Sequence, residues 1–132
     1  MRNIFLLAAL LATVGGCGPG GPVRVPVSGT VSYDGKPVEM GDILFLDPAG
    51  RYPPDGVPIT NGRYEVKVSV GPKRVEIRDR RQVPGTADPM RGGRPDEVEY
   101  IPAQYNRSST LTVEVKEGGP NTFDFPLERG KK

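Results

Sequence analysis

The chain has 132 residues, with 18 basic and 16 acidic side chains and a formal net charge of +2. The two signs are interspersed, which excludes the strongly basic face that nucleic-acid binding needs. Histidine and tryptophan are absent and there is one cysteine, so this chain alone cannot build a Ser-His-Asp or Cys-His nucleophile or a Cys/His zinc site.

An apolar run covers residues 4–14, directly after a short positive start at Arg2. As a helix this run would span roughly 16 Å, far less than the ~30 Å hydrocarbon core of a bilayer. Its length and flanks are typical of the core of a signal peptide. We therefore expect residues 1–16 to be an export signal that is absent from the mature protein.

The single cysteine follows this run in the sequence Val14-Gly15-Gly16-Cys17. This sequence resembles the bacterial lipobox, in which an apolar residue and two small residues precede a cysteine. The resemblance implies cleavage between Gly16 and Cys17, a diacylglyceryl group on the Cys17 thiol and an acyl chain such as palmitate on its new amino group. Two or more acyl chains make a stable membrane anchor. The alternative is an ordinary secreted protein with a leftover thiol.

The residues after Cys17 indicate where an anchored domain would lie. Gly18 occupies the position where aspartate often signals retention in the inner membrane of Gram-negative bacteria, so the outer membrane is favoured. Residues 17–24, rich in Gly and Pro, have the composition of a flexible tether. Cys17 to Val25 spans at most ~30 Å when extended. We expect a cell-envelope protein whose domain lies close to the bilayer.

From Val25 onward, apolar residues recur at every second position, which predicts half-buried β-strands. The alternating runs lie at 25–33, 63–70, 74–78, 110–116 and 122–128, and a run at 43–46 is apolar on both faces. Asp34-Gly35 and Asn61-Gly62 predict tight hairpin turns, because these residues tolerate positive φ. Short strands with frequent turns predict an all-β sandwich.

Residues 79–99 break this pattern. They are rich in charge and contain three prolines. The segment is too long for a tight turn, and long loops of this kind are often functional or disordered. We expect it to be irregular.

Several short motifs, in their order along the chain, resemble those of carboxypeptidase regulatory-like domains. They are residues 27–38 (VSGTVSYDGKPV), 61–64 (NGRY), 70–73 (VGPK), and 100–106 (YIPAQYN) followed by 111–115 (LTVEV). The third motif departs from the family pattern in its Gly-Pro order and its missing tyrosine. The resemblance covers most of residues 25–128, leaves 129–132 as a polar tail, and implies a seven-stranded antiparallel β-sandwich of the prealbumin-like (transthyretin-like) or Ig-like kind. In larger proteins such domains are accessory modules without catalytic activity.

Two groups of carboxylates are candidates for chemistry. Asp96, Glu97 and Glu99 cluster in the long loop, but a glycosidase needs two carboxyls that face each other across a cleft, so a solvated loop is the stronger interpretation. A second set of aspartates offers oxygen ligands for calcium, but it lacks a ligand loop of known spacing. That set is Asp42, Asp47 and Asp55. We therefore predict no catalytic residue, metal or cofactor.

Three tyrosines lie outside the alternating runs and are candidates for contact with a ligand such as a sugar: Tyr52, Tyr100 and Tyr105. Tyr100 and Tyr105 could instead anchor a loop on the sandwich. The basic run at residues 78–81 could touch anionic head groups or polysaccharide, or could be a charged edge that prevents sheet-to-sheet pairing. Residues 106–108 match a glycosylation sequon, which is a chance match if the lipobox holds.

Together these features predict a non-catalytic, lipid-anchored protein of the cell envelope that serves as a structural or interaction module. Its expected partners are the membrane, through Cys17, and envelope proteins or polysaccharide. One alternative is an adhesin-like domain that binds carbohydrate or protein at the surface. A remote alternative is a carboxylate-dependent hydrolase.

Overall fold

The computed structural model describes residues 21–130, so the predicted export signal and Cys17 lie outside the described part. Within it the chain is all-β, as predicted, with two short 3-10 helices, η1 (Pro89–Arg91) and η2 (Ala103–Tyr105). No helix in this part is long and apolar enough to cross a membrane. The strands are β1 (Arg24–Tyr33), β2 (Lys36–Pro37), β3 (Met40–Leu46), β4 (Asp55–Thr60), β5 (Arg63–Ser69), β6 (Gly71–Arg78), β7 (Arg80–Gln82), β8 (Glu97–Glu99), β9 (Thr112–Val115) and β10 (Phe125–Leu127).

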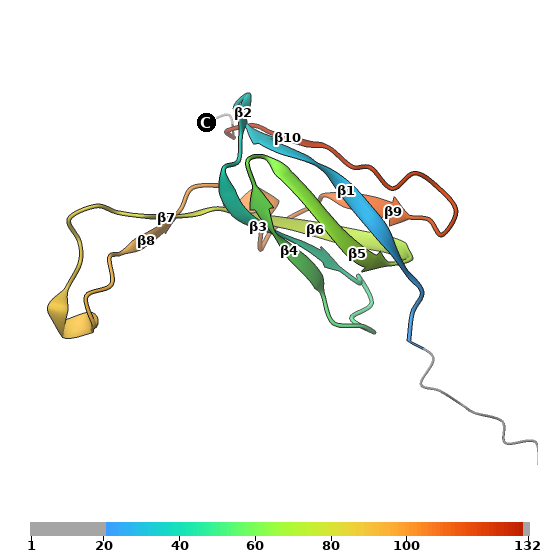
Figure 1. The fold of residues 1–132 in the computed structure, drawn as a ribbon, viewed down its shortest axis with the longest axis horizontal. Helices are drawn as coiled ribbons and strands as arrows, with labels where there is room; N and C mark the ends of the chain where they lie inside the picture. The colour runs from blue at the N-terminus through green and yellow to red at the C-terminus, as the bar shows by residue number, and fades with distance from the viewer. Residues whose placement is uncertain (1–20, 131–132) are drawn as a thin grey trace, which may run out of the picture.

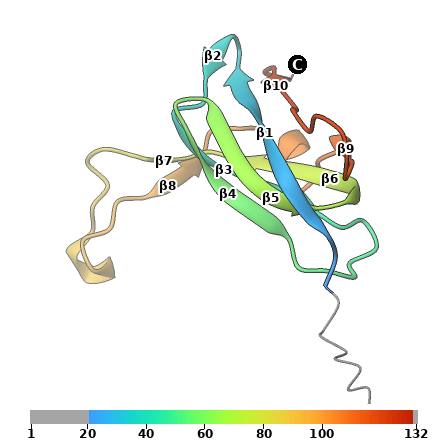
Figure 2. The ribbon, with the colours of Figure 1, turned by 45° about the vertical axis from the view of Figure 1, so that its right-hand side comes forward.

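Seven strands follow the order β10-β1-β5-β4-β3-β6-β9, and β2 pairs with the end of β1. The sheet curls so that its two outer strands, β9 and β10, come to the same side of the molecule (Figures 1 and 2). The predicted seven-stranded sandwich is thereby confirmed. One pairing differs from the antiparallel expectation, because β10 runs parallel to β1, with Val31 opposite Phe125.

The period-two pattern of the sequence places the predicted apolar faces in the core. In β1, Val27 and Val31 are buried, and in β6 so are Val75 and Ile77. Gly29 interrupts the β1 face because a Cβ at this position would collide with the carbonyl oxygen of Phe123. That close approach lets the segment leading to β10 lie against β1.

The run at 43–46 has two different faces in β3. Ile43 and Phe45 are fully buried in the core, whereas Leu44 and Leu46 are half-buried on the opposite side of the sheet. Gly56, on the neighbouring strand β4, leaves room for Leu44, because a Cβ at Gly56 would meet the Leu44 side chain. The outer face is therefore covered in part by its own neighbours.

Both predicted hairpin turns are present. Asp34 and Gly35 have φ of 49° and 78°, and Asn61 and Gly62 have φ of 51° and 73°. Two successive positive φ values define the type I′ turn, whose twist matches that of the flanking strands. These turns join β1 to β2 and β4 to β5.

The expectation that residues 79–99 are irregular is wrong at the two ends of the segment, where two short strands form. Strands β7 and β8 pair in register, with Arg81 opposite Val98, and the connecting segment turns over η1. Residues 80–99, here called the arm, project from the body of the domain (Figure 1). The three prolines lie outside the two paired strands, so they do not interrupt the ladder. The described side chains of both strands are exposed, so these strands leave no apolar alternation in the sequence.

Candidate functional site

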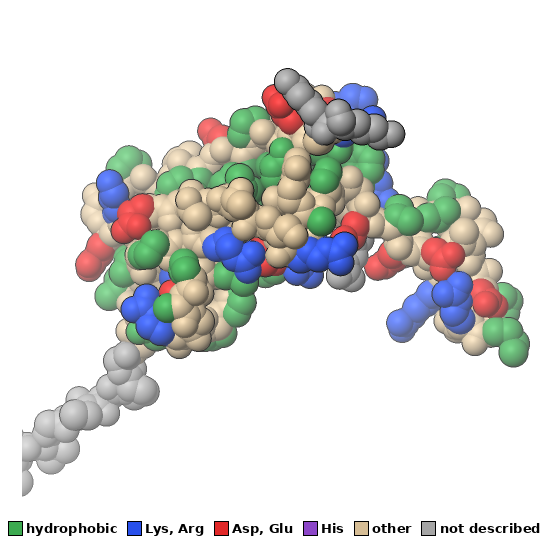
Figure 3. Space-filling model, turned by 180° about the vertical axis from the view of Figure 1, so that it is seen from behind, with side chains coloured by type: hydrophobic (Ala, Val, Ile, Leu, Met, Phe, Trp, Pro, Cys, Tyr) green, Lys and Arg blue, Asp and Glu red, His purple; other side chains and the backbone are tan. Residues whose placement is uncertain are grey.

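The arm exposes apolar side chains along its length. Met90 in η1 is 93% exposed and Val98 in β8 is 50% exposed. The space-filling view shows the arm standing apart from the body, with both charge types along it and hydrophobic side chains towards its tip (Figure 3). Single exposed apolar residues are routine on monomeric proteins, and these two lie on a ribbon that projects from the body.

The connecting segment of the arm is held by local polar contacts. The Asp88 carboxylate accepts a hydrogen bond from the Met90 amide at 2.8 Å and so caps η1. Arg91 forms an ion pair with Asp96 at 2.9 Å, with both side chains about half exposed. Thr86 accepts from the Asp96 amide at 2.7 Å. The arm has a defined shape of its own, although it contributes nothing to the hydrophobic core.

A hollow of about 500 Å³ lies where the arm leaves the sheet. It is lined by Tyr33, Lys36, Pro37, Val38, Glu39, Asn61, Asp79, Arg81 and Tyr100. Asp79 directly follows β6 and is buried, and its carbonyl oxygen accepts a hydrogen bond from the Tyr100 amide at 2.9 Å, closing the base of the arm. Because Lys36 and Arg81 are balanced by Glu39 and Asp79, the hollow suits a polar ligand better than a strongly charged one.

Two tyrosines and an arginine stack at this base. The guanidinium carbon of Arg81 lies 3.8 Å from the centroid of the Tyr100 ring, in cation–π geometry. Tyr100 in turn meets Tyr33 edge-on, with centroids 5.1 Å apart and an interplanar angle of 73°. Arg81 also approaches the Asp79 carboxylate at 3.4 Å. Tyr33 is buried at the end of β1, so this stack joins the arm to the sheet.

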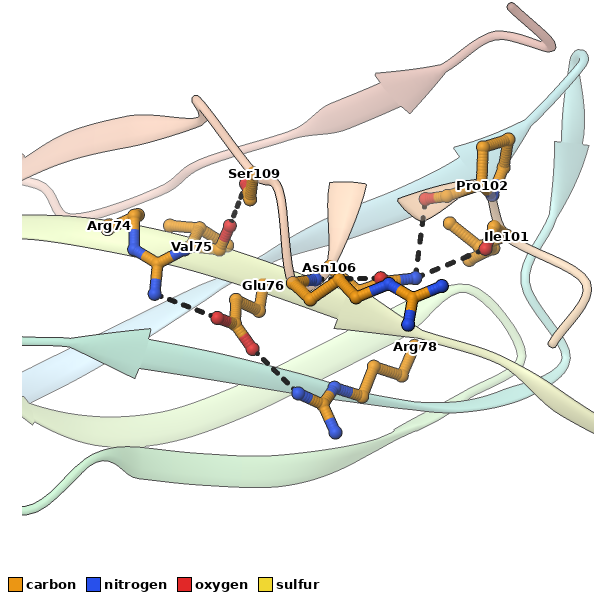
Figure 4. Close-up of polar contacts among 9 residues, drawn as sticks. Arg74, Val75, Glu76, Arg78, Ile101, Pro102, Asn106 and Ser109 are labelled. Atoms are coloured by element: carbon orange, nitrogen blue, oxygen red, sulfur yellow. Dashed lines mark hydrogen bonds and ion pairs between the residues drawn. The ribbon is translucent and has the colours of Figure 1, made fainter. Parts of the chain in front are cut away.

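The loop that follows the arm is fixed on β6 by buried polar groups (Figure 4). Asn106 is 1% exposed, and its amide nitrogen donates to the carbonyl oxygens of Ile101 at 3.2 Å and Pro102 at 3.3 Å. The Ser109 hydroxyl donates to the Val75 carbonyl. Ile101 enters the core. These contacts set the position of Tyr100, one residue before Ile101.

A buried charge lies on the other face of β6. Glu76 is 5% exposed and pairs with Arg74 and Arg78, each at 2.9 Å (Figure 4). The Nε atom of Arg78 is buried and has no hydrogen-bond partner among the described residues. The basic run at 78–81 therefore crosses the junction between β6 and the arm, where the guanidinium groups of Arg78 and Arg81 lie beside Glu76 and Asp79.

The opposite end of the domain is defined by Arg24, where β1 begins, and by the β3–β4 loop, residues 47–54; we call it the entry end. Arg24 forms an ion pair with Asp55 at 3.0 Å, and Asp55 also accepts from the Ser69 amide at 3.1 Å. The Asp55 side chain is 6% exposed. These contacts tie the starts of β1 and β4 to the end of β5.

The β3–β4 loop is organised around one carboxylate. Asp47 accepts from the backbone amides of Ala49 at 3.3 Å and Arg51 at 3.0 Å, and from the Arg51 guanidinium at 3.0 and 3.2 Å. The hydrogen bonds from Arg51 lower the pKa of Asp47 to about 2, against an ordinary value of 3.8. Gly50 completes the turn with φ of 65°. The loop is thus preorganised while Arg51 and Tyr52 remain exposed.

The three candidate tyrosines do not form one surface. Tyr52 is at the entry end, 41% exposed, with the Arg51 guanidinium 5.9 Å from its ring centroid. Tyr100 is at the base of the arm, 39% exposed. The Tyr105 hydroxyl donates to the carbonyl of Glu128 at 3.0 Å and accepts from its amide at 3.1 Å, so it anchors η2 beside β10.

The candidate aspartates are also apart. Asp42 is exposed on β3, while Asp47 and Asp55 are each buried with their own arginine. Within residues 21–130, no group of three or more His, Cys, Asp and Glu residues could hold a metal ion.

The carboxylates of the arm and the sequon have separate surroundings. Asp96 is paired with Arg91, and Glu97 and Glu99 are exposed on β8. The burial of Asn106 leaves the sequon amide without access to a modifying enzyme.

Sequence reasoning missed the stack of Arg81 on Tyr100 and the role of Asn106. The pairing of residues 80–82 with 97–99 is what brings Arg81 to Tyr100. A local signal existed in the opposite charges of Arg80–Arg81 and Glu97–Glu99, which favour cross-strand pairing. Nothing in the local sequence of Asn106 indicates that it is buried.

The described residues define a curled β-sandwich domain with a projecting two-stranded arm. No family model matches the chain, and no curated protein matches it. Among solved structures, a 9R-lipoxygenase from Cyanothece PCC8801 is similar over 80% of this chain, with a TM-score of 0.41 and 16% sequence identity. The chain covers 16% of that lipoxygenase. This likeness carries no inference about activity.

Proposed function

We propose that this chain is a non-catalytic, lipid-anchored cell-envelope module that presents the arm to a protein partner. The observation that carries the proposal is the arm itself, a projecting ribbon that exposes Met90 and Val98, with Tyr100 exposed at its base. A ribbon with an exposed apolar tip and paired charges along its sides has the mixed character of a protein-contact surface. The resemblance to carboxypeptidase regulatory-like domains agrees with a role without catalysis.

The position of the arm supports this role. The ten residues of β1 span about 30 Å from Arg24 to Tyr33. Arg24 is where the chain enters the domain, and Tyr33 contacts Tyr100 at the base of the arm. A domain anchored through Cys17 would therefore hold its arm at the end away from the bilayer, accessible to other envelope proteins.

Photo-crosslinking tests the arm. A benzophenone amino acid replaces Met90, and a control replaces Thr112, an exposed residue of β9. In the envelope of the native host we expect a discrete protein adduct from position 90 and none from position 112. Identical adducts from both positions, or none from position 90, would contradict the proposal.

A variant with a shortened arm is the control for the crosslinking experiment. Val83 donates its amide to the carbonyl of Asp96 at 2.8 Å, so an Asn-Gly turn can replace residues 84–95 between them. Because these residues contribute nothing to the core, we expect the free energy of unfolding to change by less than about 0.5 kcal/mol. With the crosslinker at Val98, the adduct formed by the full arm should be lost in the shortened variant.

Mass spectrometry tests the anchor, because Cys17 lies outside the described residues and its lipidation rests on the sequence. The mature protein from the membrane fraction should begin at Cys17 and carry acyl chains. Cys17→Ser should move the protein out of the membrane fraction. A membrane-bound Cys17→Ser protein, or a wild-type protein with a free thiol, would contradict lipid anchoring.

A second candidate partner is an envelope polysaccharide held in the hollow. The observation that favours it is the pair of tyrosines, Tyr33 and Tyr100, beside the donors of Arg81 and Lys36. Tyr100→Ala should then abolish retention on a polysaccharide affinity gel, while the arm-shortened variant should be retained. The reverse pattern would favour the protein partner.

A further inference from the structure

We infer that the entry end of the domain is a membrane-contact surface, in which Arg24 and the β3–β4 loop bind the anionic head groups of the bilayer that holds the lipid anchor. This inference rests on the proposed lipid anchoring. The length of chain before the domain limits the distance, because Cys17 to Val25 reaches at most ~30 Å even when fully extended. The described chain enters the domain at the entry end, where β1 begins (Figures 1 and 2), so a short connection to the anchor would hold this end towards the bilayer.

The charges at this end are arranged with the cations outward. The side chains of Arg24 and Arg51 are 47% and 63% exposed, whereas those of their partners Asp55 and Asp47 are 6% and 1% exposed. An approaching phosphate therefore meets guanidinium groups first. Each guanidinium has five N–H donors, and the carboxylates leave several of them free for phosphate oxygens.

The entry end also presents side chains suited to the interface between water and lipid, on the β3–β4 loop and just before β1. Tyr52 is 41% exposed and Val23 is 49% exposed, and Pro53 and Pro54 are exposed beside Tyr52. Tyrosine is enriched at membrane interfaces because its ring is apolar and its hydroxyl is polar. The space-filling view shows basic and hydrophobic side chains beside the start of the described chain, with acidic side chains further up the same end (Figure 3).

The loop does not need to fold on contact. Asp47 fixes Ala49 and Arg51 through backbone hydrogen bonds, and the Asp47 carbonyl accepts from the Gly50 amide at 2.9 Å. Because the loop is already ordered in the free protein, binding to the membrane costs little conformational entropy, and weak contacts with individual head groups are enough for docking. The anchor adds to this effect, because it raises the local concentration of lipid around the loop.

The absence of tryptophan makes the test direct, since Tyr52→Trp and Tyr100→Trp each create a single reporter. The two positions are 41% and 39% exposed, so they are matched in the free protein. The full lipidated chain is reconstituted into vesicles of phosphatidylcholine with phosphatidylglycerol, with and without bromine on the acyl chains. We expect the fluorescence at position 52 to shift to the blue and to be quenched by the brominated lipid, and that at position 100 to stay unchanged.

The outcomes separate this inference from the anchor. If both tryptophan variants float with the vesicles but neither is quenched, the inferred head-group contact is contradicted and the lipid anchor is supported. If the proteins do not float, the anchor and the contact both fail. A blue shift at position 52 that depends on protein concentration without quenching would mean that copies of the chain cover this end, and would overturn the inference.

A charge-matched pair of variants tests the head-group chemistry. Arg24→Gln removes a cation at the entry end, and Arg63→Gln removes one from the other end of β5, beside the Asn61-Gly62 turn. With phosphatidylglycerol present, Arg24→Gln should lower the ratio of docked to undocked protein about fivefold, and Arg63→Gln should leave it unchanged. Equal effects, or the same docking on phosphatidylcholine alone, would contradict binding to anionic head groups.

Discussion

The entry end and the arm end of this domain are both built from loops and charged residues, but they are held in different ways. At the entry end, Asp47 and Asp55 bury their carboxylates, and these accept hydrogen bonds from backbone amides of the β3–β4 loop and of β5 respectively. On the arm, the comparable pair of Arg91 and Asp96 has both partners about half exposed. Burial makes a charged hydrogen bond costly to break, whereas an exposed ion pair contributes little. The entry end is therefore part of the stable structure, and the arm is an attachment to it.

The largest expected effect is from the loss of Asp55. Asp55→Ala leaves the Ser69 amide without its acceptor and Arg24 without its partner, so the free energy of unfolding should fall by about 2–4 kcal/mol. Asp96→Ala on the arm should lower it by less than about 1 kcal/mol. Urea unfolding measures both, and equal losses would remove the distinction between the two ends.

The next effect depends on pH and concerns Asp47. The pKa of Asp47 is lowered in the folded protein from 3.8 to about 2. The stability that the ionised carboxylate contributes is therefore fully present at a pH above the unfolded pKa, and it is lost as the pH falls through the folded pKa. The NMR shift of the Arg51 amide, which donates to Asp47, should therefore titrate with a midpoint near pH 2. Asp47→Asn should abolish that transition. A midpoint near the ordinary value would mean that the loop is not held by Asp47.

The smallest effect is expected at the base of the arm. A double-mutant cycle of Arg81→Ala and Tyr100→Ala should give a coupling free energy of about 0.5–1 kcal/mol, as for exposed cation–π pairs. The corresponding cycle for Arg51 and Tyr52 should give a smaller coupling, because that guanidinium lies 5.9 Å from the ring centroid against 3.8 Å for Arg81. Urea unfolding again supplies the measurement, and a coupling free energy near zero for Arg81 and Tyr100 would show that the stack at the arm contributes no stability.

Much of the fold could be predicted because its signals are local. The alternation in β1 and β6 and the turns at 34–35 and 61–62 follow from neighbouring residues alone. The parallel pairing of β10 could not be predicted, since it depends on the chain crossing over after β9 to lie beside β1. The arm was missed because a ribbon exposed on all sides has no buried face to create an apolar period.

The candidate sites were less accessible to prediction. The sequence indicated Tyr52, Tyr100 and Tyr105 as candidates for ligand contact. The structure places them at three separate positions: the entry end, the base of the arm and beside β10. Asp47 was considered as a metal ligand, and its carboxylate instead organises a loop with Arg51 four residues later. Such roles depend on which side chain reaches which partner, and residue type alone does not specify this.

By itself, the sequence determined the all-β class, the main strands of the sandwich and two of its turns, because backbone preference and apolar period act between near neighbours. Only the tertiary structure decided that Arg81 stacks on Tyr100, that Asn106 is buried, and that the arm and the start of β1 lie at opposite ends. These features join residues that are distant along the chain, and curling of the sheet around its core is what brings them together or holds them apart.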